Sequence, residues 1–181
     1  MSSSETQDDI NSNSKDMAAF FILIILSLLI VAGFTVYAVK TIGYVPTCLS
    51  ATYYLLPKHK VLFRIAMIAA GFLALPAWLE ASPENWQFLA FLGCAGLVFI
   101  GAAPAFLDHF EGKVHYTATA IAAASAVLWL TFASEWGWIA LLGFVLCAIP
   151  FVAKKPKNWL FWAEMAVLAS TYTGIMISLS L

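Results

Sequence analysis

Residues 18–39 read AAFFILIILSLLIVAGFTVYAV, and this stretch decides the fold of the chain. It contains no charged residue and is long enough for a transmembrane helix, which needs about 20 mostly apolar residues. Five further apolar runs follow, at residues 61–80, 85–107, 115–133, 136–153 and 159–180. The sequence therefore predicts an all-α fold, a polytopic transmembrane helical bundle with six spans.

The composition agrees with a membrane environment. Of the 181 residues, 62% are hydrophobic and only 10% are charged, and the mean hydropathy is +0.89. Soluble domains have about 25% charged residues, so this chain has too little polar surface to cover a globule in water. The net charge of −1 gives no electrostatic reason to expect nucleic acid as a partner.

The segments outside the spans predict the domain organisation. Residues 1–17 form a polar, acidic, Ser-rich tail that is predicted to be disordered. This tail lacks the basic region of a signal peptide, so the first span is expected to remain as an anchor. Connections such as ASPEN and SE are short and make their flanking helices antiparallel neighbours. Residues 18–181 are therefore predicted to form a single transmembrane helical bundle domain.

Basic residues near the ends of the spans predict the orientation, because short cytoplasmic loops are enriched in Lys and Arg. On the six-span count only Lys15 lies on one side, and the other side has eight: Lys40, Lys58, Lys60, Arg64, Lys113, Lys154, Lys155 and Lys157. This places the loop 107–117 in the cytoplasm and both termini outside. We expect a multi-pass protein of a bacterial inner (plasma) membrane.

Tryptophans near the span ends predict the two interfacial belts. The expected outer belt contains Trp78, Trp86, Trp136 and Trp138, and the expected inner belt contains Trp159 and Trp162.

Residues 41–57, TIGYVPTCLSATYYLLP, have two interpretations. They are mostly apolar but contain Gly43, Pro46 and Pro57. They could form an interfacial or re-entrant piece shielded by the bundle. Alternatively they form a short seventh span, which would move the N-terminal tail to the cytoplasm.

Small residues predict close packing between neighbouring helices, since no hydrophobic force drives helices together in lipid. Ala118, Ala122 and Ala126 recur every four residues on one face of the span 115–133, and Gly93 and Gly96 are expected to act similarly in the span 85–107.

Ionisable side chains within the bilayer are costly and indicate functional sites. Arg64, Asp108, His115 and Glu164 all approach from the predicted cytoplasmic side and are expected to converge just below that surface. Glu164 has no polar neighbour along its helix, so we expect it to pair with Arg64 or His115, or to stay protonated. The alternative is structural: Arg64 reaches toward lipid headgroups, and His115 merely begins a helix.

Motifs of soluble enzymes are missing from the sequence. It contains no G-x-S-x-G, H-E-x-x-H, P-loop or C-x-x-C pattern. The cysteines Cys48, Cys94 and Cys147 are widely spaced, which predicts neither a disulfide framework nor a zinc site. Three histidines are few for a metal enzyme, so we expect neither a metal nor a cofactor.

The segment VPTCLSATYYLLPKHKVLF resembles the P-S-I-S-x-Y-Y stretch of uncharacterised bacterial multi-pass proteins, which are similar to FRAG/DRAM-like membrane proteins. The matching positions of the motif are Pro46, Ser50, Tyr53, Tyr54, Leu62 and Phe63, with Pro104, His115, Tyr116 and Ala118 further on. The resemblance covers residues 44–130, and Cys48 and Leu49 stand where the motif has Ser-Ile. It implies a bacterial membrane protein of unknown activity and adds Ser50 and Tyr53 to the candidate pocket residues.

Three functions follow as hypotheses. The leading one is a cytoplasm-facing polar pocket that binds a lipid headgroup or small molecule, formed by Ser50, Tyr53, Arg64, Asp108, His115 and Glu164. The second is an intramembrane metal-dependent hydrolase, because a hydroxyl, a carboxylate and a histidine suit such chemistry. The third is a small proton-coupled transporter, although no internal repeat is evident. Membrane lipids are the expected partners, and the sequence leaves the oligomeric state open.

Overall fold

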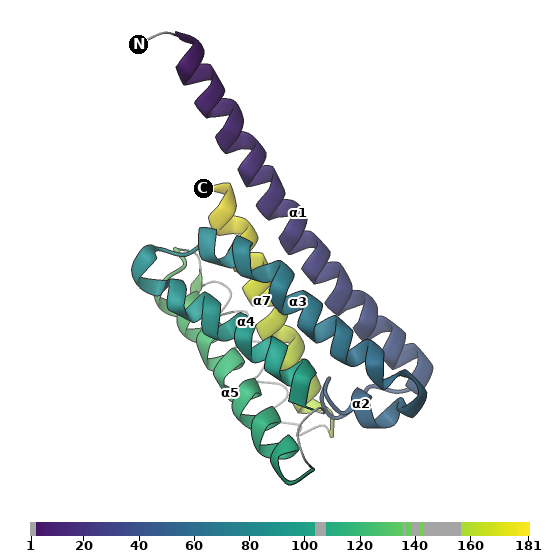
Figure 1. Cartoon of the computed structure of the whole chain (residues 1–181). Coiled ribbons are helices and arrows are strands. Elements are labelled where there is room, and N and C mark those ends of the chain that lie inside the picture. The colour runs from purple at the N-terminus through teal and green to yellow at the C-terminus, as the bar shows by residue number, and fades with distance from the viewer. Residues whose placement is uncertain (1–2, 104–107, 136, 139–141, 143–156) are drawn as a thin grey trace.

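A computed structural model of the chain describes residues 3–103, 108–135, 137–138, 142 and 157–181, and gives the backbone alone for residues 3–14 and 108–111 (Figure 1). The described part is all-helical. Its elements are α1 (Ser3–Ile42), α2 (Thr52–Leu55), η1 (Pro57–His59), α3 (Lys60–Glu80), η2 (Glu84–Trp86), α4 (Gln87–Ala102), α5 (Asp108–Phe132) and α7 (Trp159–Ser180).

Five of these helical segments are long and apolar enough to cross a membrane. They are Lys15–Ile42, Pro57–Glu80, Glu84–Ala102, Gly112–Phe132 and Trp159–Ser180. They confirm the predicted helical bundle and match five of the six predicted spans. The sixth predicted span, residues 136–153, lies almost wholly outside the described residues. The fold is that of a polytopic membrane protein.

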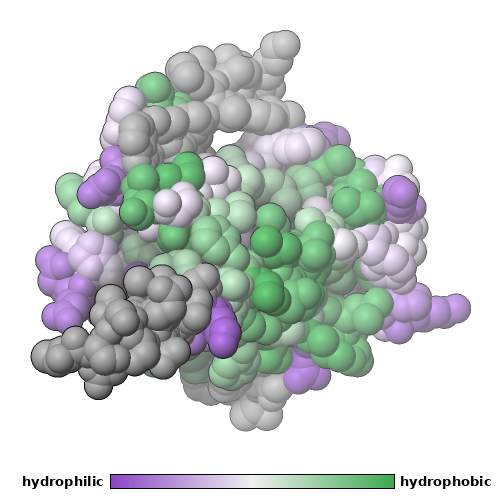
Figure 2. Space-filling view, turned by 90° about the horizontal axis from the view of Figure 1, so that it is seen from above, coloured by the Kyte–Doolittle hydropathy of each residue, from purple (hydrophilic) through white to green (hydrophobic). Residues whose placement is uncertain are grey.

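The surface of the bundle agrees with lipid as its solvent. Large apolar side chains lie more than half exposed along the outer faces of α1, α3 and α4, for example Leu29, Phe72 and Phe91. Apolar side chains also cover a broad continuous area in Figure 2, with hydrophilic ones around its margin. Soluble monomers rarely expose contiguous patches of this extent, so these faces are suited to acyl chains.

The backbone of α1 continues through the polar tail as far as Ser3. Residues 3–17 contain neither Gly nor Pro, so nothing interrupts the helix that the apolar span begins. The span itself begins at Lys15, which leaves Glu5, Asp8 and Asp9 outside it. Disorder of this tail in water stays a prediction.

The segment between α1 and α3 does not form a seventh span. Gly43 adopts the left-handed conformation, with φ +82°, and its N–H donates to the Val39 carbonyl at 2.9 Å, which ends α1. The helix α2 has four residues and rises about 6 Å, against a hydrocarbon core of about 30 Å. Leu49 and Thr52 are buried, so the segment packs into the bundle. The re-entrant or interfacial interpretation agrees with this placement.

Small residues let α3, α4 and α5 approach to backbone contact. A Cβ added to Gly96 would lie 2.7 Å from the Ala122 Cβ and 2.9 Å from the Ala118 carbonyl oxygen. A Cβ on Gly71 would lie 2.8 Å from the Cys94 carbonyl oxygen. The predicted packing role of Gly96, Ala118 and Ala122 is therefore confirmed.

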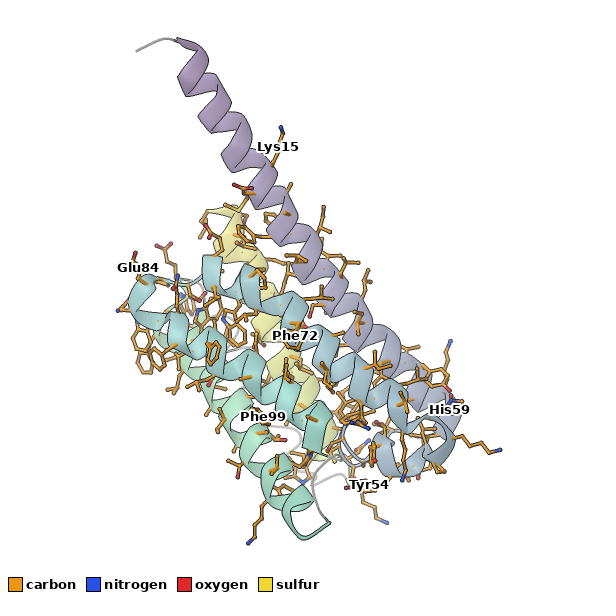
Figure 3. All side chains as sticks on the ribbon, viewed as in Figure 1. Lys15, Tyr54, His59, Phe72, Glu84 and Phe99 are labelled. Carbon is orange, nitrogen blue, oxygen red and sulfur yellow. The ribbon has the colours of Figure 1, made fainter. Side chains whose placement is uncertain are left out.

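The two ends of the bundle differ in charge. The end formed by α2 and the first residues of α3, α5 and α7, called the basic end, has the described basic residues Lys40, Lys58, Lys60, Arg64, Lys113 and Lys157 (Figure 1). The opposite end has Lys15, Glu80, Glu84 and Glu135, and is called the tryptophan end because Trp78 and Trp129 pack beneath it. Figure 3 shows His59 at the basic end and Lys15 and Glu84 at the tryptophan end.

Candidate functional site

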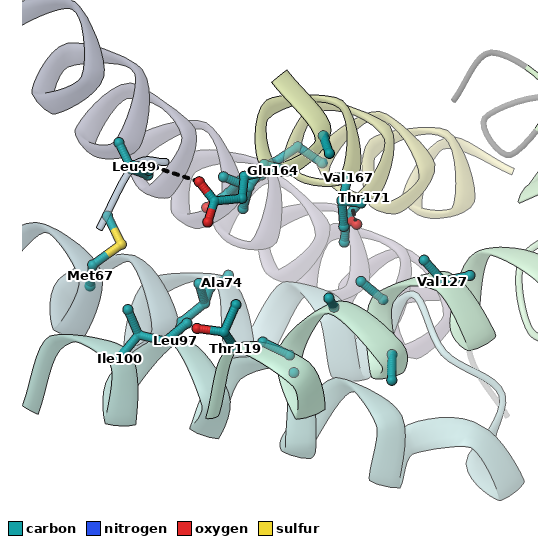
Figure 4. Close-up of a pocket in the computed structure, with 18 of the residues that line it drawn as sticks. Leu49, Met67, Ala74, Leu97, Ile100, Thr119, Val127, Glu164, Val167 and Thr171 are labelled. Atoms are coloured by element: carbon teal, nitrogen blue, oxygen red, sulfur yellow. Dashed lines mark hydrogen bonds between the residues drawn. The ribbon is translucent and has the colours of Figure 1, made fainter. Parts of the chain in front are cut away.

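A cavity of about 490 Å³ lies between α3, α4, α5 and α7 (Figure 4). Its lining runs from Phe63 to Trp78 on α3 and from Leu160 to Ile175 on α7. Fifteen residues of helix correspond to about 22 Å along the bundle. The cavity is therefore elongated and lies parallel to the helices.

The walls of the cavity are mainly apolar, and several of their polar side chains bond within the protein. The Thr119 and Thr171 hydroxyls donate to backbone carbonyls one turn earlier, at 2.9 and 2.8 Å. The Tyr172 hydroxyl shares a 2.6 Å hydrogen bond with Ser27, whose Oγ also donates to the Ala70 carbonyl at 2.8 Å. The middle of the cavity therefore presents mostly hydrocarbon to an occupant.

At the basic end, the segment 47–49 closes the cavity and is bonded to α7. The Leu49 N–H donates to Oε2 of Glu164 at 2.6 Å, shown as the dashed line in Figure 4. The Phe161 N–H donates to the Thr47 carbonyl at 3.0 Å. Phe161 lies in the first turn of α7, where backbone N–H groups have no partner within the helix. The Thr47 carbonyl thus accepts a hydrogen bond from α7, and the Glu164 side chain on α7 accepts one from Leu49.

At the tryptophan end, two indoles pack edge to face with ring centroids 5.7 Å apart. Nε1 of Trp129 donates to the Ser82 hydroxyl at 2.8 Å, and that hydroxyl donates to the Trp78 carbonyl at 2.5 Å. Trp78 lines the cavity and is only 3% exposed, and its Nε1 is buried without a hydrogen-bond partner in the part of the chain that the structure describes. Gly93 holds the ring in place, because an added Cβ there would lie 2.5 Å from it.

Among the predicted site residues whose side chains the structure describes, two line this cavity. They are Ser50 and Glu164. The Ser50 hydroxyl lies 3.3 Å from Sγ of Cys48. The carboxylate of Glu164 is bonded to the backbone of Leu49, and no ion pair joins it to Arg64 within the described residues. Its hydrogen-bond partner among the described contacts is therefore a backbone group, where the sequence predicts either pairing with Arg64 or His115 or a protonated carboxyl.

The other predicted residues lie elsewhere at the basic end. Tyr53 contacts Phe63 edge to face and has Nζ of Lys60 5.0 Å from its ring centre. Arg64 is partly buried, and its Nε has no hydrogen-bond partner among the described residues. His115 packs against Tyr116, with ring centroids 5.9 Å apart. The side chain of Asp108 lies outside the described part.

Of the predicted pocket residues with described side chains, the cavity therefore joins only Ser50 and Glu164, and the predicted site as a whole stays a prediction. Within the described residues no group of three or more His, Cys, Asp and Glu side chains could hold a metal ion.

Sequence reasoning missed Trp78 and the Leu49 N–H. Trp78 was assigned to the outer interfacial belt, because tryptophan often lies there with its indole N–H in water. The structure instead buries it against Trp129 and Gly93. One signal was available: Gly93 leaves space for a large ring on a neighbouring helix.

In comparisons with known proteins, the chain matches no family model, no curated protein and no solved structure. The resemblance to FRAG/DRAM-like membrane proteins therefore stays a prediction.

Proposed function

We propose that this protein binds a single-chain lipophilic molecule within the bundle, with the ligand's polar head near Ser50 and Glu164. The observation that supports this proposal is the elongated cavity between α3, α4, α5 and α7. Small-molecule sites commonly have volumes of about 300–1,000 Å³ and mostly apolar walls with a few polar groups. A volume of about 490 Å³ spread along roughly 22 Å suits one hydrocarbon chain better than a bulky ring system.

The polar groups at the basic end favour an uncharged, hydroxyl-bearing head. A carboxylate has about four lone-pair positions, and within the described residues one hydrogen bond to Glu164, from Leu49, is present. Glu164 can therefore accept a further hydrogen bond from a ligand hydroxyl. The Ser50 hydroxyl can donate or accept beside it. This proposal keeps the predicted lipid or small-molecule ligand but assigns most of the binding energy to its apolar chain.

The same proposal includes the location. The basic end would face the cytoplasm of a bacterial cell, and the tryptophan end would face outward across the inner membrane, because basic residues favour the cytoplasmic side. The hydrolase and transporter hypotheses are not supported by any specific contact within the described residues.

Photo-crosslinking tests the proposed binding. The purified protein in detergent would be incubated with cetyl alcohol that bears a diazirine near its chain terminus, and then irradiated. We expect labelled peptides from the cavity-facing parts of α3, α5 and α7, and loss of labelling with excess unmodified cetyl alcohol.

Two variants of α5 provide the matched control. Ala123 lines the cavity and Ala120, three residues earlier, is exposed. Ala123→Phe should fill the cavity and reduce specific labelling at least about tenfold, while Ala120→Phe should leave it unchanged. Equal labelling of both variants, or labelling that cetyl alcohol does not displace, would contradict the proposal.

A further inference from the structure

At the tryptophan end, large apolar side chains limit the length of the cavity. Among the described residues, the lining extends no further in this direction than Trp78 on α3, Val127 on α5 and Ile175 on α7. Trp78 and Ile175 are only 3% and 1% exposed. Figure 4 shows Val127 and Leu49 toward opposite ends of the cavity. Trp78, Val127 and Ile175 together are called the floor of the cavity.

Beyond the floor the helices continue as a packed core. Trp129 and Leu130 follow on α5 and Leu179 follows on α7, and all three are buried in the same cluster as Trp78. None of these three residues lines the cavity. Packed protein interiors contain few voids larger than a water molecule. An occupant of the cavity therefore finds no further space past Trp78 among the described residues.

Trp78 is held firmly in the floor. Its ring packs edge to face against Trp129, with ring centroids 5.7 Å apart, and a Cβ added to Gly93 would lie 2.5 Å from it. The Ser82 hydroxyl accepts a hydrogen bond from Nε1 of Trp129 and donates one to the Trp78 carbonyl, so the two indoles are also tied to each other. Extra volume forced into a packed site strains side chains and backbone. This indole therefore resists displacement by an occupant that is too long.

We propose that the floor limits the chain length of the ligand, with Trp78 as the residue that sets this limit. The inference rests on the proposed function, since it fixes the length of the occupant of the same cavity. A ligand whose head bonds near Ser50 and Glu164 has about 22 Å along the helices for its chain. A shorter chain leaves apolar wall unfilled, and a longer one has to strain the floor or withdraw its head from the polar groups. The ligand class is therefore a single-chain lipid of defined length.

A series of straight-chain alcohols tests this inference: decyl, lauryl, cetyl and arachidyl alcohol. Each would compete with a diazirine-bearing lauryl alcohol, whose chain is short enough to bind above the floor. Detergent takes up the longer alcohols more strongly, so each variant is compared with the wild-type protein at the same chain length. Each CH₂ group that gains or loses a buried place should change the affinity about fourfold.

Two variants move the floor in opposite directions. Trp78→Leu lowers it and should bind arachidyl alcohol at least about tenfold more tightly than the wild-type protein does, with decyl alcohol little changed. Val127→Phe raises it and should bind cetyl alcohol at least about tenfold more weakly, again with decyl alcohol little changed. Leu128→Phe is the matched control, because Leu128 is exposed and does not line the cavity, and it should match the wild type at every chain length.

The outcomes distinguish the two proposals. If no alcohol displaces the label from the wild-type protein, the proposed function fails and the inference fails with it. If alcohols displace the label but a folded floor variant changes the affinity for all chain lengths alike, or for none, the inference alone is overturned. A Trp78→Leu protein that takes up no label has not folded, and the ratio of cetyl to decyl affinity in Val127→Phe then decides.

Discussion

The two ends of the cavity treat their polar groups in opposite ways. At the basic end, the backbone of residues 47–49 and the first turn of α7 satisfy each other through Leu49–Glu164 and Phe161–Thr47 hydrogen bonds. At the tryptophan end, Nε1 of Trp129 donates to Ser82, whereas Nε1 of Trp78 has no acceptor among the described residues. The first end thus joins two segments through their backbones, and the second leaves one of two neighbouring indoles without a hydrogen bond.

The pairing of these polar groups bears on the role expected for Glu164. An ionisable residue inside a bilayer is by default a functional hypothesis, and Glu164 was the strongest such candidate in the sequence. In the structure a main part of its role is to hold a non-helical segment, since lipid cannot satisfy backbone groups. Among the described residues, Nε of Arg64 and Nε1 of Trp78 are the buried side-chain atoms without a hydrogen-bond partner.

The largest expected effect is the difference in accessibility between the two ends. Lys113 at the basic end and Pro83 at the tryptophan end are both exposed. In a chain without native cysteines, Pro83→Cys should react with an impermeant maleimide in intact cells. Lys113→Cys should react only after the membrane is opened. Labelling of position 113 in intact cells would reverse the orientation, and Gly33→Cys, within the span of α1, should stay unlabelled in both conditions.

Removal of the carboxylate at the basic end should give the next largest effect. Glu164→Ala leaves the Leu49 N–H without its acceptor and should lower the free energy of unfolding by about 2 kcal/mol. Glu164→Gln keeps an acceptor oxygen and should cost under about 1 kcal/mol. Equilibrium unfolding in mixed micelles measures both, with exposed Glu80→Ala as the control. Equal losses for Ala and Gln would show that this hydrogen bond does not hold the segment.

The smallest effect should appear between the two indoles of the tryptophan end. Trp129→Phe and Trp78→Phe remove the same atoms, but only the first removes a hydrogen bond. Trp129→Phe should therefore be less stable than Trp78→Phe by about 1 kcal/mol in the same unfolding assay. A Trp78→Phe protein that is the less stable of the two would indicate an acceptor for Nε1 in the resting protein.

Most of the fold could be predicted because the spans are local features of the sequence. Runs such as 18–39 and 159–180 contain enough apolar residues to specify a transmembrane helix without knowledge of their neighbours. Small residues at Gly96, Ala118 and Ala122 likewise predicted a close contact that the structure confirms. Residues 41–57 stayed ambiguous because their apolar composition favours a span while Gly43 and Pro46 oppose one.

The site was harder to predict because its contacts join distant parts of the chain through groups without a sequence signature. The Glu164 side chain accepts a hydrogen bond from the Leu49 N–H, 115 residues away in the sequence. Any non-proline residue at that position would supply the same donor. Ser50 and Glu164 were found from their polarity in an apolar context. Trp78 was not, because the sequence does not show whether an indole near a span end faces lipid headgroups or the interior.

The contacts of α7 also have a consequence for how the protein is made. The Ser27–Tyr172 hydrogen bond joins residues 145 positions apart, and the Leu49–Glu164 bond joins residues 115 apart. A ribosome has synthesised residues 1–163 before either partner on α7 exists. The earlier helices α3, α4 and α5 can already pack through their glycines at that stage. Insertion of α7 is therefore the step that forms these contacts, and a nascent chain truncated before Trp159 lacks the hydrogen bonds of α7 to Ser27 and to residues 47–49.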